Sequence, residues 1–112
     1  MFKTIYKHLM ANGFDCYSIG QYKGPCKKEH IVIKNNTPRG LNNIMIEEEV
    51  ELLLYYPLGN YSKVDDFINS VKEIMSELPY VDNLIPYPII VEDGKEAYMT
   101  ILSYSNTRKK VF

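Results

Sequence analysis

The sequence has little that would support a disulfide framework, a membrane span or a strong electrostatic field. Its 112 residues include two cysteines, Cys16 and Cys26, which are too few for a disulfide scaffold and favour free thiols in a reducing compartment. No apolar run approaches the roughly 20 residues of a spanning helix, so we expect no membrane partner. Thirteen basic and fourteen acidic residues give a formal net charge of −1, which provides no long-range attraction for nucleic acid.

Residue patterns typical of catalysis, metal binding or cofactor binding are also missing from the sequence. His8, His30, Cys16 and Cys26 form no close-spaced pair of the CxxC or HxxxH kind, so ordinary surface or core roles are expected for them. A Cys–His nucleophile stays formally open. No glycine-rich loop of the GxxxxGK[ST] or GxGxxG type opens a helix. We therefore expect no catalytic residue, no cofactor and no metal, and predict that the chain is not an enzyme.

What the sequence does have is the composition of one globular domain. Apolar residues make up 46% of the chain and charged residues 24%, close to the averages of globular proteins. The length fits a single domain over residues 1–112. Ten tyrosines are an excess, and tyrosine favours surfaces where apolar contact meets hydrogen bonding.

Hydrophobic periodicity predicts two helices and about five strands. The helices are expected near Phe2–Met10 and Ser62–Leu78, the second with Ser62 as its N-cap. The strands are expected at residues 16–22, 30–34, 44–56, 89–92 and 96–105. The order α-β-β-β-α-β-β indicates a single α+β domain, a mainly antiparallel sheet with the two helices packed on it. Residues 106–112, which are polar and basic, are predicted to form a mobile tail.

The strand expected at residues 44–56 has two chemically different sides. Apolar residues dominate one side, whereas Glu47, Glu49 and Glu51 share the other. Neighbouring residues of a strand point in opposite directions, so Glu47, Glu48 and Glu49 cannot ligate one ion. A solvated acidic side is therefore the expected role of the three alternate glutamates.

The last two predicted strands carry more apolar residues than one buried side requires. Asp93-Gly94 predicts a two-residue type I′ turn, which would place Glu92 opposite Lys95 and Ile90 opposite Ala97. One side of the hairpin is then apolar and suits a core. The other side is also largely apolar, and it carries Ile89, Val91, Tyr98, Leu102 and Tyr104. These five residues are predicted to form a protein–protein interface, with burial inside one chain as the alternative.

In the order and texture of its elements, the sequence resembles the tail terminator, or tail completion, proteins of long-tailed bacteriophages. The resemblance covers nearly the whole chain. It includes a short N-terminal helix, strands ending in a long one (IMIEEEVELLLYY), a helix (SKVDDFINSVKEIMSEL), a proline-rich connection and a closing hairpin (PIIVEDGKEAYMTILSY). Related neck and head–tail connector proteins share much of this texture.

The resemblance implies a structural protein of the virion, placed in the tail or neck and assembled in the host bacterial cytoplasm. Such proteins form a ring, usually six-fold, at the head-proximal end of the tail tube. The ring ends tube polymerisation and docks the tail to the head. The expected partners are therefore copies of this chain in a homohexamer, the tail tube protein and a head-completion or connector protein, with DNA only passing through the lumen.

A ring of this kind needs two different surfaces that meet head to tail. The apolar hairpin is one candidate, and Leu53, Tyr55 and Tyr56 are candidates for the second. Lumen-facing carboxylates would repel phosphates and let DNA slide, which is the role hypothesised for the glutamate side of the long strand. Two alternative functions stay open: a head–tail connector or neck protein, and a small non-viral domain that binds a partner through its tyrosine-rich surface.

Overall fold

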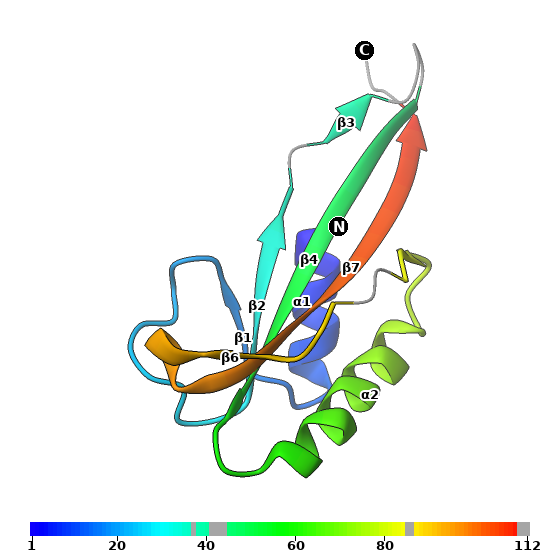
Figure 1. The fold of residues 1–112 in the computed structure, drawn as a ribbon. Coiled ribbons are helices and arrows are strands. Elements are labelled where there is room, and N and C mark those ends of the chain that lie inside the picture. The colour runs from blue at the N-terminus through cyan, green and yellow to red at the C-terminus, as the bar shows by residue number, and fades with distance from the viewer. Residues whose placement is uncertain (37, 41–44, 85–86, 110–112) are drawn as a thin grey trace.

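A mixed sheet with both helices packed against one of its faces forms the protein (Figure 1). The computed structural model describes residues 1–36, 38–40, 45–84 and 87–109. The helices are α1 (Phe2–Ala11) and α2 (Val64–Met75). This is the α+β fold that the sequence predicts, and the molecule is elongated, with extents of 49 × 26 × 26 Å.

The sheet has seven strands within the described residues. They are β1 (Cys16–Ser18), β2 (His30–Asn35), β3 (Arg39–Gly40), β4 (Met45–Pro57), β5 (Val81–Asp82), β6 (Ile90–Glu92) and β7 (Ala97–Lys109). The strand order is β1-β2-β4-β7, with β5 and β6 both on the outer edge of β7 and β3 beside β4. Among the strand pairs of the described residues, β1 and β2 are the one parallel pair. The mainly antiparallel sheet is confirmed, and the short strands β3 and β5 are additional to the prediction.

The centre of the sheet is the pair of β4 and β7, which align along all 13 residues of each strand. Val50, Leu52 and Leu54 alternate along β4 and point toward the helices. Leu102 and Tyr104 of β7 lie opposite Leu52 and Val50 and belong to the same buried cluster. We call this side of the sheet the helix face.

Each helix contributes a stripe of side chains to the helix face. Ile5 and Leu9, one turn apart on α1, are completely buried. On α2, Phe67, Val71 and Met75 repeat at four-residue spacing and fill the same core. Both predicted helices are therefore confirmed. An apolar stripe with a helical period needs a surface to cover it, and the sheet provides that surface.

The opposite side of the sheet, the far face, has a smaller apolar cluster of its own. Val32 of β2, Tyr55 of β4 and Ala97 of β7 are buried there together with Cys26. Cys26 belongs to residues 19–29, the loop that connects β1 to β2. The loop covers only one end of the far face, and the remainder bears the glutamate side of β4.

Several predicted boundaries differ from the structure, and α2 ends at Met75 rather than at the predicted Leu78. A 3-10 turn, η1 (Tyr61–Lys63), precedes α2, so Ser62 lies inside that turn and its prediction as the N-cap is wrong. The strand expected at residues 16–22 ends at Ser18. There the Ser18 amide donates a hydrogen bond to Gln21 Oε1 at 2.7 Å, and the chain turns away from the sheet.

The turn between β6 and β7 also differs from the prediction. It is a 3-10 turn, η2 (Asp93–Lys95), followed by Glu96 in the left-handed region with φ 52°. Glu92 therefore pairs with Ala97, and Ile90 pairs with Met99. The predicted register is wrong by two residues, and since side chains alternate with a period of two, each residue stays on its predicted face.

The prediction of a mobile tail is wrong for Asn106–Lys109, which continues β7. These residues pair with the first residues of β4, Met45–Glu48. Together with β3 they form a ribbon that extends past the helices (Figure 1). Residues 110–112 lie outside the described part of the chain.

None of the helices in the described residues is long and apolar enough to cross a bilayer.

Candidate assembly surface

Strand β6 is exposed on both faces, which sets it apart from the rest of the sheet. Ile90 points to the far face and is 43% exposed, and Val91 points to the helix face and is 51% exposed. The helices cover the middle of β7, at Leu102 and Tyr104, and leave the hairpin end open. Within the described residues no strand pairs with the outer edge of β6. The structure therefore leaves a short apolar edge strand at the border of the sheet.

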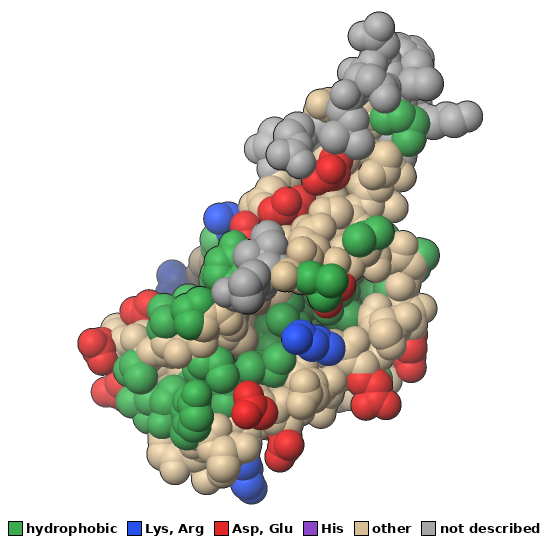
Figure 2. Space-filling model, turned by 45° about the vertical axis from the view of Figure 1, so that its right-hand side comes forward, with side chains coloured by type: hydrophobic (Ala, Val, Ile, Leu, Met, Phe, Trp, Pro, Cys, Tyr) green, Lys and Arg blue, Asp and Glu red, His purple; other side chains and the backbone are tan. Residues whose placement is uncertain are grey.

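Further apolar side chains are exposed on the connection before β6 and on the loop before α2, although Val81, opposite Ser105, lies away from the hairpin end. The connection from α2 to β6 exposes Val81, Leu84 and Tyr87, and the loop before α2 exposes Leu58 and Tyr61. Tyr61 packs edge-on against Tyr98 of β7, with ring centroids 5.1 Å apart. Figure 2 shows hydrophobic side chains gathered at the end of the molecule that carries the hairpin. Single exposed apolar residues are ordinary, but a contiguous group marks an interaction surface.

A shallow apolar groove lies on the far face of this region. Its volume is about 140 Å³, and it is lined by Tyr87, Pro88, Ile90, Met99, Thr100 and Ile101. The Thr100 hydroxyl donates a hydrogen bond to the Tyr87 carbonyl at 3.4 Å, which holds the connection over β7. The groove is thus built by the connection and the hairpin together.

An asparagine fixes the connection between β5 and β6 against the edge of β7. Asn83 donates from Nδ2 to Ser103 Oγ at 2.8 Å, and its Oδ1 accepts from Ser105 Oγ at 3.0 Å. The Asn83 amide also donates to the Ser103 carbonyl at 3.0 Å. Both serines are buried, so these bonds replace water. The network holds the exposed apolar residues of the connection in a defined place.

Asn83→Ala is expected to lower the free energy of unfolding by about 1–3 kcal/mol, because it leaves the buried Ser103 and Ser105 hydroxyls without their partner. Asn83→Asp should lose less, because a carboxylate can accept from both hydroxyls. Urea denaturation followed by circular dichroism measures both variants. Equal losses for the two variants, or no loss for the alanine, would contradict the role of the network.

The residues predicted to form an interface fall into three groups. Val91 is exposed, and Ile89, Tyr98, Leu53 and Tyr56 are half-buried. Three others are buried within the single chain: Leu102 and Tyr104 in the core of the helix face, and Tyr55 in the cluster beneath residues 19–29.

For these three residues the expectation of an exposed surface is wrong. The helices cover Leu102 and Tyr104, and the loop covers Tyr55. Burial, with a smaller contribution from Asp82, raises the pKa of Tyr104 to about 12, so its hydroxyl stays neutral. Leu53, Tyr55 and Tyr56 also do not form one patch, because Tyr56 packs against Phe67 on the helix face, with ring centroids 5.8 Å apart.

The predicted glutamate side of the long strand exists. Glu47, Glu49 and Glu51 lie at alternate positions of β4, on the far face. Asn36 Nδ2 donates to Glu49 Oε1 at 2.7 Å and to Glu51 Oε1 at 2.9 Å. Lys34 of β2 lies opposite Glu51 in the register. The bridging amide orders two of the three carboxylates into a fixed acidic strip.

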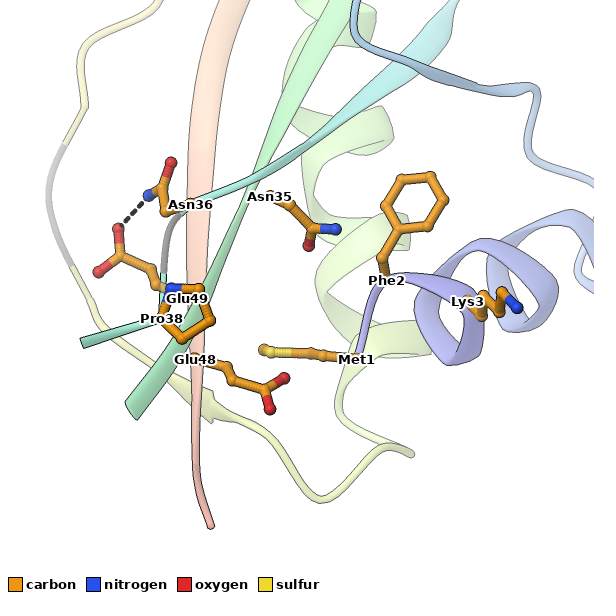
Figure 3. Close-up of a pocket in the computed structure, with 8 residues that line it drawn as sticks. All are labelled: Met1, Phe2, Lys3, Asn35, Asn36, Pro38, Glu48 and Glu49. Atoms are coloured by element: carbon orange, nitrogen blue, oxygen red, sulfur yellow. Dashed lines mark hydrogen bonds between the residues drawn. The ribbon is translucent and has the colours of Figure 1, made fainter. Parts of the chain in front are cut away.

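A larger groove opens where the start of α1 meets β2 and β4. It has a volume of about 420 Å³, and Met1, Phe2, Lys3, Asn35, Asn36, Pro38, Glu48 and Glu49 line it. Figure 3 shows the side chains of Met1 and Glu48 directed toward one another, with Lys3 pointing away. The groove mixes apolar, amide and charged groups, and it brings no nucleophile next to a base.

Cys26 and His30 are the one Cys–His pair that the described residues bring together. Cys26 Sγ lies 3.7 Å from His30 Nδ1, and both side chains are buried. Burial raises the pKa of the Cys26 thiol and lowers the pKa of the His30 imidazole, so the pair is neutral rather than a reactive thiolate–imidazolium pair. Among the described residues no three His, Cys, Asp or Glu side chains converge as a metal site.

No model of a known protein family matches the chain, and no curated protein matches it in sequence. Its fold is a small α+β domain, and its distinguishing surface is an apolar hairpin left uncovered at one edge of the sheet.

Proposed function

We propose that this protein is a structural subunit that assembles with copies of itself into a ring of the phage tail terminator kind. The observation that carries the proposal is the exposure of β6 on both faces, at Ile90 and Val91. Covering apolar surface is favourable by about 25 cal/mol per Å². An edge strand that is apolar on both sides gains this energy only when another chain covers it.

A head-to-tail contact needs a second, different surface, and the opposite edge of the sheet offers one. β1 forms that edge, and Ile19, which follows it directly, is exposed. Met10 at the end of α1 is exposed as well, and α1 packs beside β1. A contact between the β6 edge of one copy and the β1 edge of the next is heterologous, and repeating it with a rotation closes a ring.

In this proposal the ring has the mechanical role that the resemblance implies. It ends polymerisation of the tail tube, offers a docking surface to the head, and lets DNA pass. The acidic strip of Glu47, Glu49 and Glu51 faces the lumen, where its carboxylates repel the phosphates. The chain binds no cofactor and catalyses no reaction in this role.

The test is the mass and shape of the assembled protein. Native mass spectrometry over a concentration series is expected to show one discrete assembly, with a mass of six copies of the 13.1 kDa chain. Because some ring proteins assemble only on their tube, the same measurement is repeated with purified tail tubes. A monomer under every condition would contradict the proposal and favour the partner-binding domain.

Electron microscopy of the same assembly tests the position of the acidic strip. Glu49, which Asn36 holds in place at 2.7 Å, should line the central channel. Finding the far face of β4 at the outer rim would remove the lumen assignment, while the ring itself would stand.

A further inference from the structure

We infer that residues 19–29, the loop between β1 and β2, form a strap over the far face that neutral His30 latches and that opens when this imidazole gains a proton. The inference is independent of the proposed function, because it concerns contacts within one chain.

His30 is enclosed by aromatic rings from three parts of the chain. Tyr22 of the strap stacks on its ring at a centroid distance of 3.8 Å and an angle of 13°. Tyr55 of β4 stacks on the opposite side at 5.1 Å and 14°. Tyr17 of β1 meets the imidazole edge-on at 5.7 Å. The ring is only 1% exposed, so the strap is joined to the sheet through this histidine.

The strap is also held at the turn of the hairpin. The Cys26 amide donates to the Lys95 carbonyl at 2.7 Å. Lys95 Nζ in turn donates to the Tyr22 carbonyl at 3.3 Å and lies 5.6 Å from the centre of the Tyr22 ring. Figure 1 shows the loop reaching across to the turn between β6 and β7. Val32 and Ala97 are buried in the cluster that Cys26 of the strap completes.

The hydrogen bonds of His30 favour the neutral ring in the closed strap. Nδ1 lies 2.9 Å from the Lys28 carbonyl, which can only accept, so Nδ1 carries the hydrogen. Nε2 is buried and has no hydrogen-bond partner in the described part of the chain. In the neutral ring Nε2 is an acceptor without a donor, whereas a proton there would make it a buried charged donor with no acceptor. Opening the strap gives Nε2 access to water and removes this penalty.

The charged groups around the ring do not reverse this preference. Burial is the largest influence and lowers the pKa of His30; the Lys28 carbonyl and Asp15 act in the opposite direction, and Lys95 lowers the pKa again. Asp15 also accepts a hydrogen bond from the Tyr17 hydroxyl at 2.9 Å.

The remaining titratable neighbours stay neutral as the pH falls through the range in which His30 titrates. These neighbours are the hydroxyls of Tyr17 and Tyr55 and the thiol of Cys26, whose pKa values are all raised, so they ionise only in alkali. Only the imidazole therefore changes its charge inside the enclosure.

The pH window follows from the sign of the shift. In the open strap His30 has its ordinary pKa of about 6.5, and in the closed strap the pKa is lower. The closed state therefore has its full stability above about pH 6.5. Below that pH the equilibrium constant for closing falls about tenfold per pH unit, until the pH reaches the pKa of the closed state.

Hydrogen exchange of the strap amides, corrected for the intrinsic rate at each pH, tests the latch. Between about pH 7.5 and about pH 5 the wild-type protection of residues 19–29 is expected to fall by up to about thirtyfold. His30→Phe keeps a flat ring between the two tyrosines but cannot gain a proton, so its protection should be the same at both pH values. The Lys28 carbonyl keeps a donor in this variant, because Cys26 Sγ lies 3.2 Å from it.

His8→Gln is the matched control, since the chain has two histidines and His8 lies on α1, where it pairs with Glu77 at 3.0 Å. This control should respond to pH as the wild type does. Unchanged wild-type protection, or an equal loss in His30→Phe, would overturn the latch. If His30→Phe does not fold, an NMR titration of the wild type decides. Strap amide signals that shift with the same pH midpoint as the His30 ring signals support the latch, and different midpoints overturn it.

Discussion

Replacing Leu102 with aspartate is expected to unfold the protein, although the sequence alone places this residue on a candidate interface. Leu102 is 9% exposed and lies opposite Leu52 in the central strand pair. Removing a leucine from such a core costs about 2–5 kcal/mol, and a carboxylate in its place adds a buried charge. A domain of this size is stable by about 5–15 kcal/mol, so circular dichroism should show no cooperative thermal transition.

Val91→Asp is the matched control, because it places the same charge on the same face of the same hairpin. Val91 is 51% exposed, so the change should alter the free energy of unfolding by no more than about 0.5 kcal/mol. Leu102→Ala should fall between the two, with a loss of about 2–5 kcal/mol. A Leu102→Asp variant that melts like the wild type would show that the helices do not cover this part of β7.

The elements whose pattern is local were predictable from the sequence. The stripe of Phe67, Val71 and Met75 has a helical period, and the alternation around Val50 and Leu52 has the period of a strand. Each pattern reports on which side of an element must be covered. The fold class follows from the order of these elements, since amphipathic helices need a sheet face to pack on.

What the sequence could not predict depends on contacts between distant segments. Asn106–Lys109 is polar and basic, and it forms a strand only because Met45–Glu48 supplies the partner more than 50 residues earlier in the chain. The Asp93-Gly94 dipeptide suits a two-residue turn, but it equally occupies the 3-10 turn that the structure has. A dipeptide that favours a turn does not determine how many residues the loop contains.

The candidate surface was only partly predictable, because it also depends on contacts between distant segments. The alternation of residues assigns Val91, Leu102 and Tyr104 to one face of the sheet. It does not show how far along that face the helices extend. Because α1 and α2 are short, they cover Leu102 and Tyr104 and stop before Val91. The enclosure of His30 was missed altogether, and the four-residue spacing of Cys26 and His30 is its only local signal.

Ile90→Asp combined with Val91→Asp is expected to abolish self-association while the monomer stays folded. Each side chain is about half exposed in the single chain, and each becomes a buried, unpaired carboxylate once a second copy covers β6. A buried charge without a partner typically costs several kcal/mol, and each 1.4 kcal/mol weakens association tenfold. Two such charges per contact should therefore shift native mass spectra to the monomer at every concentration.

The control for this variant introduces the same charge away from the hairpin. Thr4→Asp combined with Ser70→Asp places two carboxylates on exposed positions of α1 and α2, so its assembly should match the wild type. Loss of assembly in both double variants would assign the effect to net charge rather than to β6. A fully assembled Ile90→Asp, Val91→Asp variant with native circular dichroism would show that copies meet elsewhere. The exposure of β6 would then carry no argument for a ring.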